Sequence, residues 1–215
     1  MLDNIVYILL IVAVIVYSVF YFKRSFEIRL KYFLIYLVIT LLLEILSAYL
    51  YSKNKDTIWV YHILLFFEFN SLLLFFREIT ESKSTKKFTN ILICVFNLVY
   101  LLSSMYYYEI GSYLVQYNAI ASVFGSVLIT ISLVFYYKEF LVSDRILNYK
   151  KSISFWITFG LSVYYLGFIP FTSIINLMSD IPSELKDYFF MLPVFLSIFM
   201  YSCFIFGALW SQKQV

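Results

Sequence analysis

The sequence predicts an all-α, polytopic integral membrane protein with seven transmembrane helices. Three observations predict this fold class: 63% of the 215 residues are hydrophobic, only 13% are charged, and the mean hydropathy is +0.87. Soluble domains carry about 25% charged residues, so this chain lies outside their range. Long apolar runs with short linkers fill residues 1–215, and we therefore expect a single transmembrane domain without a separate soluble domain.

A helix needs about 20 apolar residues to cross a hydrocarbon core about 30 Å thick. We therefore expect seven spans, at about residues 4–22, 32–51, 58–77, 88–107, 113–137, 153–177 and 188–210. The N-terminus carries Asp3 rather than basic residues, and no A-x-A-like cleavage site follows the first span, which indicates a retained helix rather than a cleaved signal peptide. Because this span carries no charge in its core, we expect it at the lipid-facing edge.

The second span carries a polar stripe. Its members recur at steps of three or four residues, which places them on one face of a helix: Tyr36, Thr40, Glu44, Ser47 and Tyr51. Glu44 is the acidic member of the stripe, about 18 Å along the helix from the start of the span. We expect the stripe to face the interior of the protein.

The third span holds the strongest site candidate. It contains the run YHILLFFEFNSLLLFFR, with Glu68, Asn70 and His62, the only histidine in the chain. A charged group inside hydrocarbon costs at least about 2.5–3.5 kcal/mol, so Glu68 needs a partner, a proton or water. The polar groups project from several faces, so we expect this helix in the middle of the bundle. His62 lies about one turn into the span near Trp59, where we expect it to touch water at the membrane surface.

Glu44 and Glu68 are expected at similar depths on adjacent antiparallel helices. Two carboxyl groups that meet in a medium of low dielectric constant cannot both ionise easily, so one would become a protonated donor beside an ionised acceptor. Such a pair suits an acid/base enzyme, a proton relay or a hydrogen-bonded structural contact. The sequence leaves all three alternatives open.

The next three spans also carry polar residues at helical spacing. The fourth has Asn90, Asn97 and Ser104, the fifth has Asn118, Ser122, Ser126 and Thr130, and the sixth has Thr158, Ser162, Tyr165, Thr172 and Asn176. For Asn97, Asn118 and Asn176 the spacing favours hydrogen bonds between helices over contacts to a ligand. Because spans two to six all carry polar stripes, we expect a polar and partly hydrated interior.

Small residues and prolines predict local features of the later spans. Ala121 and Gly125 permit close packing of a second helix, within the chain or in a homo-oligomer. Pro170 and Pro193 each remove a backbone hydrogen bond and predict kinks in the sixth and seventh spans.

The composition also excludes several classes of site. One histidine cannot supply a histidine-based metal centre, and no lysine lies within the seventh span to hold a retinal group. The five glycines form no phosphate-binding loop. We therefore expect no metal, no cofactor and no nucleic-acid partner.

The distribution of basic residues predicts the orientation. Assigning Lys and Arg to alternate loops gives thirteen on one side and three on the other, and these three are Lys53, Lys55 and Lys186. By the positive-inside rule, the N-terminus lies outside and the C-terminus in the cytoplasm. We expect the plasma (inner) membrane of a bacterium as the location.

These observations favour a protein that binds or translocates a small solute or a proton. The candidate ligand- or proton-binding residues are Glu68, Glu44, His62, Asn70, Asn97, Asn118 and Asn176. A second hypothesis is a membrane sensor or effector subunit that acts through a cytoplasmic partner protein, docked on the basic loops at 83–87 and 145–151. An intramembrane carboxylate enzyme ranks third. The lipid bilayer is the partner in every case.

Overall fold

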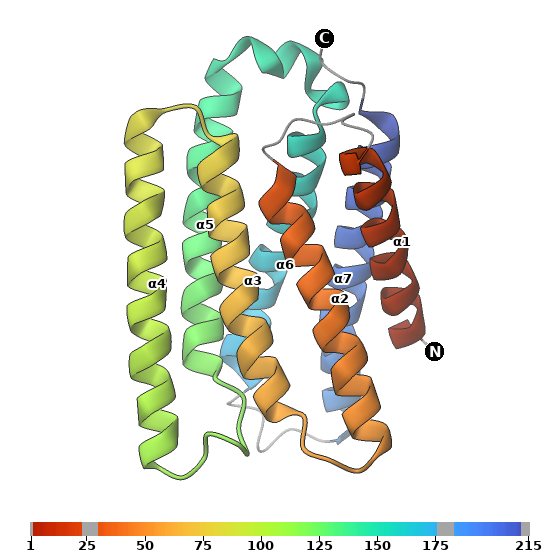
Figure 1. The fold of residues 1–215 in the computed structure, drawn as a ribbon, viewed down its shortest axis with the longest axis vertical. Helices are drawn as coiled ribbons and strands as arrows, with labels where there is room; N and C mark the ends of the chain where they lie inside the picture. Colours follow the sequence, from red (N-terminus) through yellow and green to blue (C-terminus); the bar gives the residue numbers. More distant parts are fainter. Residues whose placement is uncertain (1, 23–29, 176–182, 212–215) are drawn as a thin grey trace. The chain divides into compact units, whose positions relative to one another are not determined.

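The computed structural model describes residues 2–22, 30–175 and 183–211, and it is built from long helices (Figure 1). The elements are α1 (Leu2–Phe22), α2 (Lys31–Ser52), α3 (Ile58–Ile79), α4 (Lys83–Glu109), α5 (Ala119–Val142), the 3-10 helix η2 (Asp144–Lys151), α6 (Ile153–Ile175) and α7 (Ser183–Trp210). Within the described ranges, seven helices are long and apolar enough to cross a membrane. The chain is therefore an all-helical integral membrane protein, as predicted.

One predicted boundary is wrong. The fifth span was expected to begin at residue 113, but α5 begins at Ala119, and residues 110–118 form a loop. At the end of α4, Gly111 has φ +69° and Ser112 N–H donates to Tyr107 O at 2.9 Å, which is the pattern of a helix ended by glycine. At the start of α5, Asn118 Oδ1 accepts from Ala121 N–H at 3.0 Å and caps the new helix.

The chain divides into two compact units, which we describe separately. Unit 1 comprises Met1–Glu27 and Leu133–Val215, and unit 2 comprises Ile28–Ser132. The boundary falls within α5. The prediction that residues 1–215 form a single domain stays a prediction.

In unit 2, α3 is the central helix. It packs against both α2 and α4, and the ring of Phe69 lies so close to Gly125 that a Cβ atom there would be 2.7 Å from it. This confirms, within unit 2, the expected central place of the third span and the close packing expected at Gly125.

The α2 and α3 helices run antiparallel and side by side (Figure 1). Two contacts define their register. Ser47 Oγ donates to Tyr61 Oη at 3.2 Å, and the rings of Phe33 and Phe75 lie 5.3 Å apart between centroids. We call this contact between the two helices the α2–α3 seam. In both contacts the two residue numbers add up to 108, so residue n of α2 lies opposite residue 108 − n of α3.

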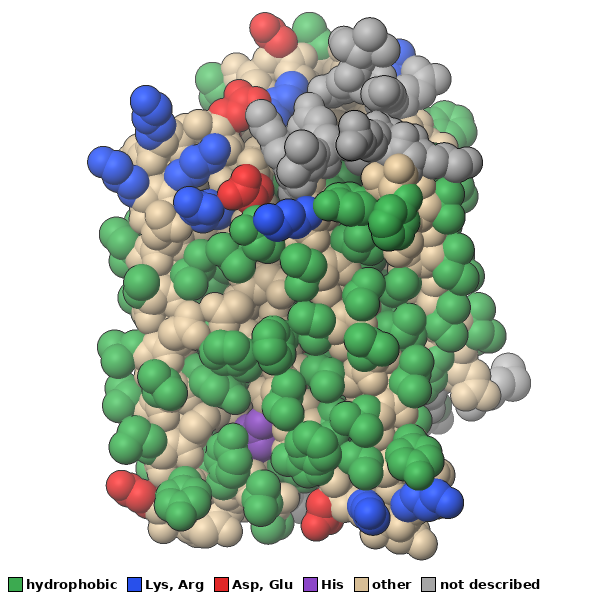
Figure 2. Space-filling model, viewed as in Figure 1, with side chains coloured by type: hydrophobic (Ala, Val, Ile, Leu, Met, Phe, Trp, Pro, Cys, Tyr) green, Lys and Arg blue, Asp and Glu red, His purple; other side chains and the backbone are tan. Residues whose placement is uncertain are grey.

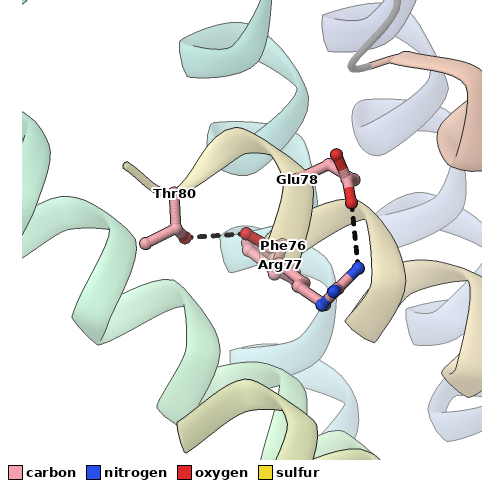
Figure 3. A network of polar contacts seen from close by, with 4 residues as sticks. All are labelled: Phe76, Arg77, Glu78 and Thr80. Atoms are coloured by element: carbon pink, nitrogen blue, oxygen red, sulfur yellow. Dashed lines mark hydrogen bonds and ion pairs between the residues drawn. The ribbon is translucent and has the colours of Figure 1, made fainter. Parts of the chain in front are cut away.

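The charged residues of unit 2 lie mostly at its helix ends, and hydrophobic side chains cover the stretch between them (Figure 2). Figure 3 shows one such end, where α3 finishes. Thr80 Oγ1 donates to Phe76 O at 2.7 Å. The backbone N–H of Thr80 donates to the same carbonyl at 3.2 Å, so residue 80 ends α3 with both its side chain and its backbone. Arg77 pairs with Glu78 at 3.0 Å, and both side chains remain about one third exposed.

In unit 1, α7 packs against both α1 and α6. Tyr17 Oη donates to Phe204 O at 3.2 Å and connects α1 to α7. The α6–α7 contact is close because Gly160 approaches the Met200 carbonyl. Pro170 and Pro193 lie inside α6 and α7, and the kinks expected there stay predictions.

Candidate functional site

Thr40 and Glu68 lie at the same level of the α2–α3 seam. On α2, Thr40 is seven residues from both Phe33 and Ser47, which form the two contacts given above. On α3, Glu68 is likewise seven residues from both Tyr61 and Phe75. Seven residues are nearly two helical turns, so both residues return to the contact face. Thr40 is 7% exposed and its Oγ1 is buried without a hydrogen-bond partner, whereas Glu68 is half-buried. The middle of the seam thus combines an acid with an unused hydroxyl.

Tyr117 supplies a second hydroxyl near Glu68. Its Oη donates to Ser122 Oγ at 3.0 Å, and Ser122 is 1% exposed, so the hydroxyl end of the side chain is buried although the ring is partly open. Burial raises the pKa of the Tyr117 hydroxyl above its ordinary value, the negative charge of Glu68 raises it further, and the bond to Ser122 opposes both effects. An effect of the Glu68 charge requires proximity. The Tyr117 hydroxyl therefore stays protonated at neutral pH, within reach of the Glu68 charge.

His62 lies beneath the 110–118 loop. Its Nε2 is 2.8 Å from Tyr113 O, its ring stacks on the Tyr113 ring at 4.4 Å, and Tyr100 Oη donates to the His62 carbonyl at 3.1 Å. His62 is only 1% exposed, so the expected contact with water is wrong. The reason is that the loop, which the sequence placed inside a helix, folds over the histidine instead.

The two ring nitrogens of His62 have different surroundings. Since the partner of Nε2 is a carbonyl oxygen, Nε2 carries the hydrogen and donates it. Nδ1 is buried without a hydrogen-bond partner, and in the neutral ring it is an acceptor. This unused acceptor is, like the Thr40 hydroxyl, a buried polar atom of unit 2 without a hydrogen-bond partner.

Asn118 connects the loop to α4. Its Nδ2 donates to Ser103 Oγ at 2.9 Å and to Ser104 Oγ at 3.4 Å, while Oδ1 caps α5 as described above. The side chain is completely buried. Asn118 was expected to form hydrogen bonds between helices. It does bond to α4, but from the loop that precedes α5, and it thereby positions this loop.

Asn70 and Asn97 form a reciprocal amide pair between α3 and α4. Asn97 Nδ2 donates to Asn70 Oδ1 at 2.8 Å, and Asn70 Nδ2 donates to Asn97 Oδ1 at 3.4 Å. Each amide also donates to the carbonyl four residues earlier in its own helix, from Phe66 and Ile93. The expected interhelical role of Asn97 is confirmed, and that both residues also contact a ligand stays a prediction.

Glu44 lies close to the site but not at the same level. The register places it opposite Leu64, about one helical turn or ~6 Å along the axis from the level of Glu68. It is half-buried. That the two carboxyl groups meet stays a prediction. Asn176, the remaining candidate, lies outside the described residues.

The sequence did not identify four residues that shape this site: Thr40, Tyr113, Tyr117 and Ser122. Thr40 and Ser122 were noticed only as members of polar stripes, and the two tyrosines were counted as apolar residues of a span. The signal that was present is Asn118, a favoured N-cap residue. Within the part of the chain that is described, no group of three or more His, Cys, Asp or Glu side chains could hold a metal ion.

Comparison of the chain with models of protein families, with curated proteins and with solved structures finds no match.

Proposed function

We propose that this protein binds a small solute or a proton at Glu68 and moves it across the membrane. The observation that supports the proposal most directly is the position of Glu68 halfway along α3, at the contact with α2. Glu68 is the eleventh of the 22 residues of α3, about 15 Å from the start of the helix. An acid at that depth is costly, and such acids mark ion or substrate pathways.

The surrounding groups support binding rather than a purely structural role. Thr40 Oγ1 is buried and unpaired, which costs about 1–3 kcal/mol unless a ligand or water supplies a partner. The Tyr117 hydroxyl stays protonated and lies within reach of the Glu68 charge. An ammonium, amide or hydroxyl group of a solute would donate to the Glu68 carboxylate, while Thr40 and Tyr117 complete its hydrogen bonds. When the cargo is a proton, the carboxylate takes it up.

The 110–118 loop covers one end of this site. It is closed by the stacking of Tyr113 on His62 and by the bonds of Asn118 to α4. We orient this end toward the outside, with the N-terminus outside and the C-terminus in the cytoplasm of a bacterium, because the basic residues favour that topology. Opening of the loop would then admit the solute from the external side.

The test is proton flux into proteoliposomes that contain a trapped pH-sensitive dye, driven by a potassium diffusion potential. We expect Glu68→Gln to abolish the flux. The matched control is Glu109→Gln, which removes an exposed acid at the end of α4 and should leave the flux unchanged. Thr40→Val keeps the shape of the side chain but removes the hydroxyl, and it should reduce the flux.

Two outcomes would contradict the proposal, provided that thermal unfolding shows each variant to be folded. Flux that is equal in the wild type and in Glu68→Gln would remove this residue from the mechanism. No flux in the wild type, together with a soluble protein that co-purifies with it, would instead support a sensor or effector subunit.

A further inference from the structure

The segment between α5 and α6 forms a separate surface in unit 1. Residues 143–152 connect Val142, the last residue of α5, to Ile153, the first residue of α6, and most of them form η2 (the turquoise arch in Figure 1). Both flanking helices are long and apolar enough to span a membrane. A ten-residue connection between two spans has to stay close to the membrane boundary, whichever way the chain is oriented.

Apolar side chains on this segment and at the adjoining end of α5 are strongly exposed. Val142 is 86% exposed and Leu147 is 82% exposed, and Ile146 and Tyr149 are also exposed. No residue of η2 is buried. The segment therefore does not fold its apolar residues into unit 1, although it contacts α6 and α7.

Basic side chains accompany these apolar ones. The segment carries Arg145, Lys150 and Lys151 against a single acid, Asp144, so its formal charge is 3 − 1 = +2. The backbone at Lys150 is fixed to the start of α6, because Trp156 Nε1–H donates to Lys150 O at 3.0 Å. The two lysines are exposed and are thus presented from an anchored position beside the span.

We propose that η2 and the end of α5 form a binding surface for anionic phospholipids of the adjacent leaflet. Leu147 and Val142 enter the region between headgroups and acyl chains, and Lys150 and Lys151 contact the headgroup phosphates. This combination of apolar and basic side chains is the pattern of segments that lie in a membrane interface. Lipid fits better than a soluble partner because the exposed apolar side chains lie next to a membrane-spanning helix. The inference does not depend on Glu68 or on transport.

The test uses Trp156 as a local reporter. The chain has three tryptophans, and replacing Trp59 and Trp210 by Phe leaves one beside η2. This variant is reconstituted into phosphatidylcholine vesicles that contain either brominated phosphatidylglycerol or brominated phosphatidylcholine, at equal bromine content. We expect stronger quenching of Trp156 by the anionic lipid. Each basic residue near a membrane contributes about fivefold to anionic lipid binding, so Lys150→Gln with Lys151→Gln should remove most of this preference.

The matched control removes two lysines elsewhere. Lys53→Gln with Lys55→Gln changes the net charge equally, at the exposed turn between α2 and α3, and it should leave the preference intact. Thermal unfolding of each variant confirms that it is folded. The proposal is overturned if both lipids quench Trp156 equally, which would leave the surface to a soluble partner, or if the preference survives the loss of Lys150 and Lys151. It is also overturned if inorganic phosphate, at an ionic strength matched with chloride, abolishes the preference, because the site would then take a free anion.

Discussion

Replacing Asn118 by alanine should expose His62 to chemical modification. Asn118 holds the 110–118 loop closed in two ways, as the N-cap of α5 and through its bond to Ser103. Loss of an N-cap costs about 1 kcal/mol, and loss of a side-chain hydrogen bond in a membrane protein costs about 0.6 kcal/mol. The sum of about 1.6 kcal/mol corresponds to an approximately 15-fold larger population of the open loop at 25 °C.

The assay is the rate at which diethylpyrocarbonate modifies the imidazole. His62 is the only histidine in the chain, so with a histidine-free affinity tag the signal reports one residue. The expected rate for Asn118→Ala is about 15 times that of the wild type. Ser103→Ala loses only the bond between loop and α4, and it should accelerate the reaction about threefold.

Ser132→Ala is the matched control, because Ser132 Oγ bonds only within its own helix, to Leu128 O. It should leave the rate unchanged. The reasoning is refuted if Asn118→Ala reacts no faster than the wild type, or if Ser103→Ala reacts as fast as Asn118→Ala. The first result would mean that the loop does not control access to His62, and the second that the cap contributes nothing.

Three further predictions concern packing and ionisation. Gly125→Ala should lower the stability measured by thermal unfolding by about 1–3 kcal/mol, because the added methyl group meets Phe69; an unchanged melting temperature would contradict this contact. Asn70→Leu should destabilise unit 2 more than the double change with Asn97→Leu, because the single change removes the partner of the half-buried Asn97 amide on the other helix and leaves its Oδ1 without the bond from Asn70. Additive losses of stability in a double-mutant cycle would argue against the pair. The pKa of Tyr117 is raised in the folded state, so folded stability should fall as the pH rises above 10, the ordinary pKa of tyrosine. Tyr117→Phe should weaken this fall. Identical pH profiles of stability for the wild type and this variant would contradict the prediction.

Regular, repeated features of this fold could be predicted from the sequence. Hydropathy identified the seven helices, and helical spacing identified the buried positions of the second span, since Tyr36, Thr40 and Ser47 are all buried. Tyr51, in the same stripe, is 79% exposed because it lies at the very end of α2. The distribution of polar groups around the third span correctly indicated neighbours on several sides.

The parts that could not be predicted depend on local geometry and on contacts between distant residues. A hydropathy window counts Tyr113 and Tyr117 as apolar, and so it extends the fifth span across a loop. The Schellman-type turn at Gly111 and the cap at Asn118 are hydrogen-bond features that hydropathy does not measure. The burial of His62 follows from that loop, which lies some fifty residues away in the sequence, and no local pattern around His62 reports it.

The most direct measurement of whether a solute can reach Glu68 is the reactivity of a cysteine placed at that position. Cys94 and Cys203, the two native cysteines, are first replaced by serine. The account predicts that Glu68→Cys reacts with a small, water-soluble, cationic thiol reagent in membrane vesicles, whereas Phe67→Cys, at a neighbouring exposed and apolar position of α3, does not. An unreactive cysteine at 68, or equal reactivity at 67 and 68, would contradict a solute pathway that passes Glu68.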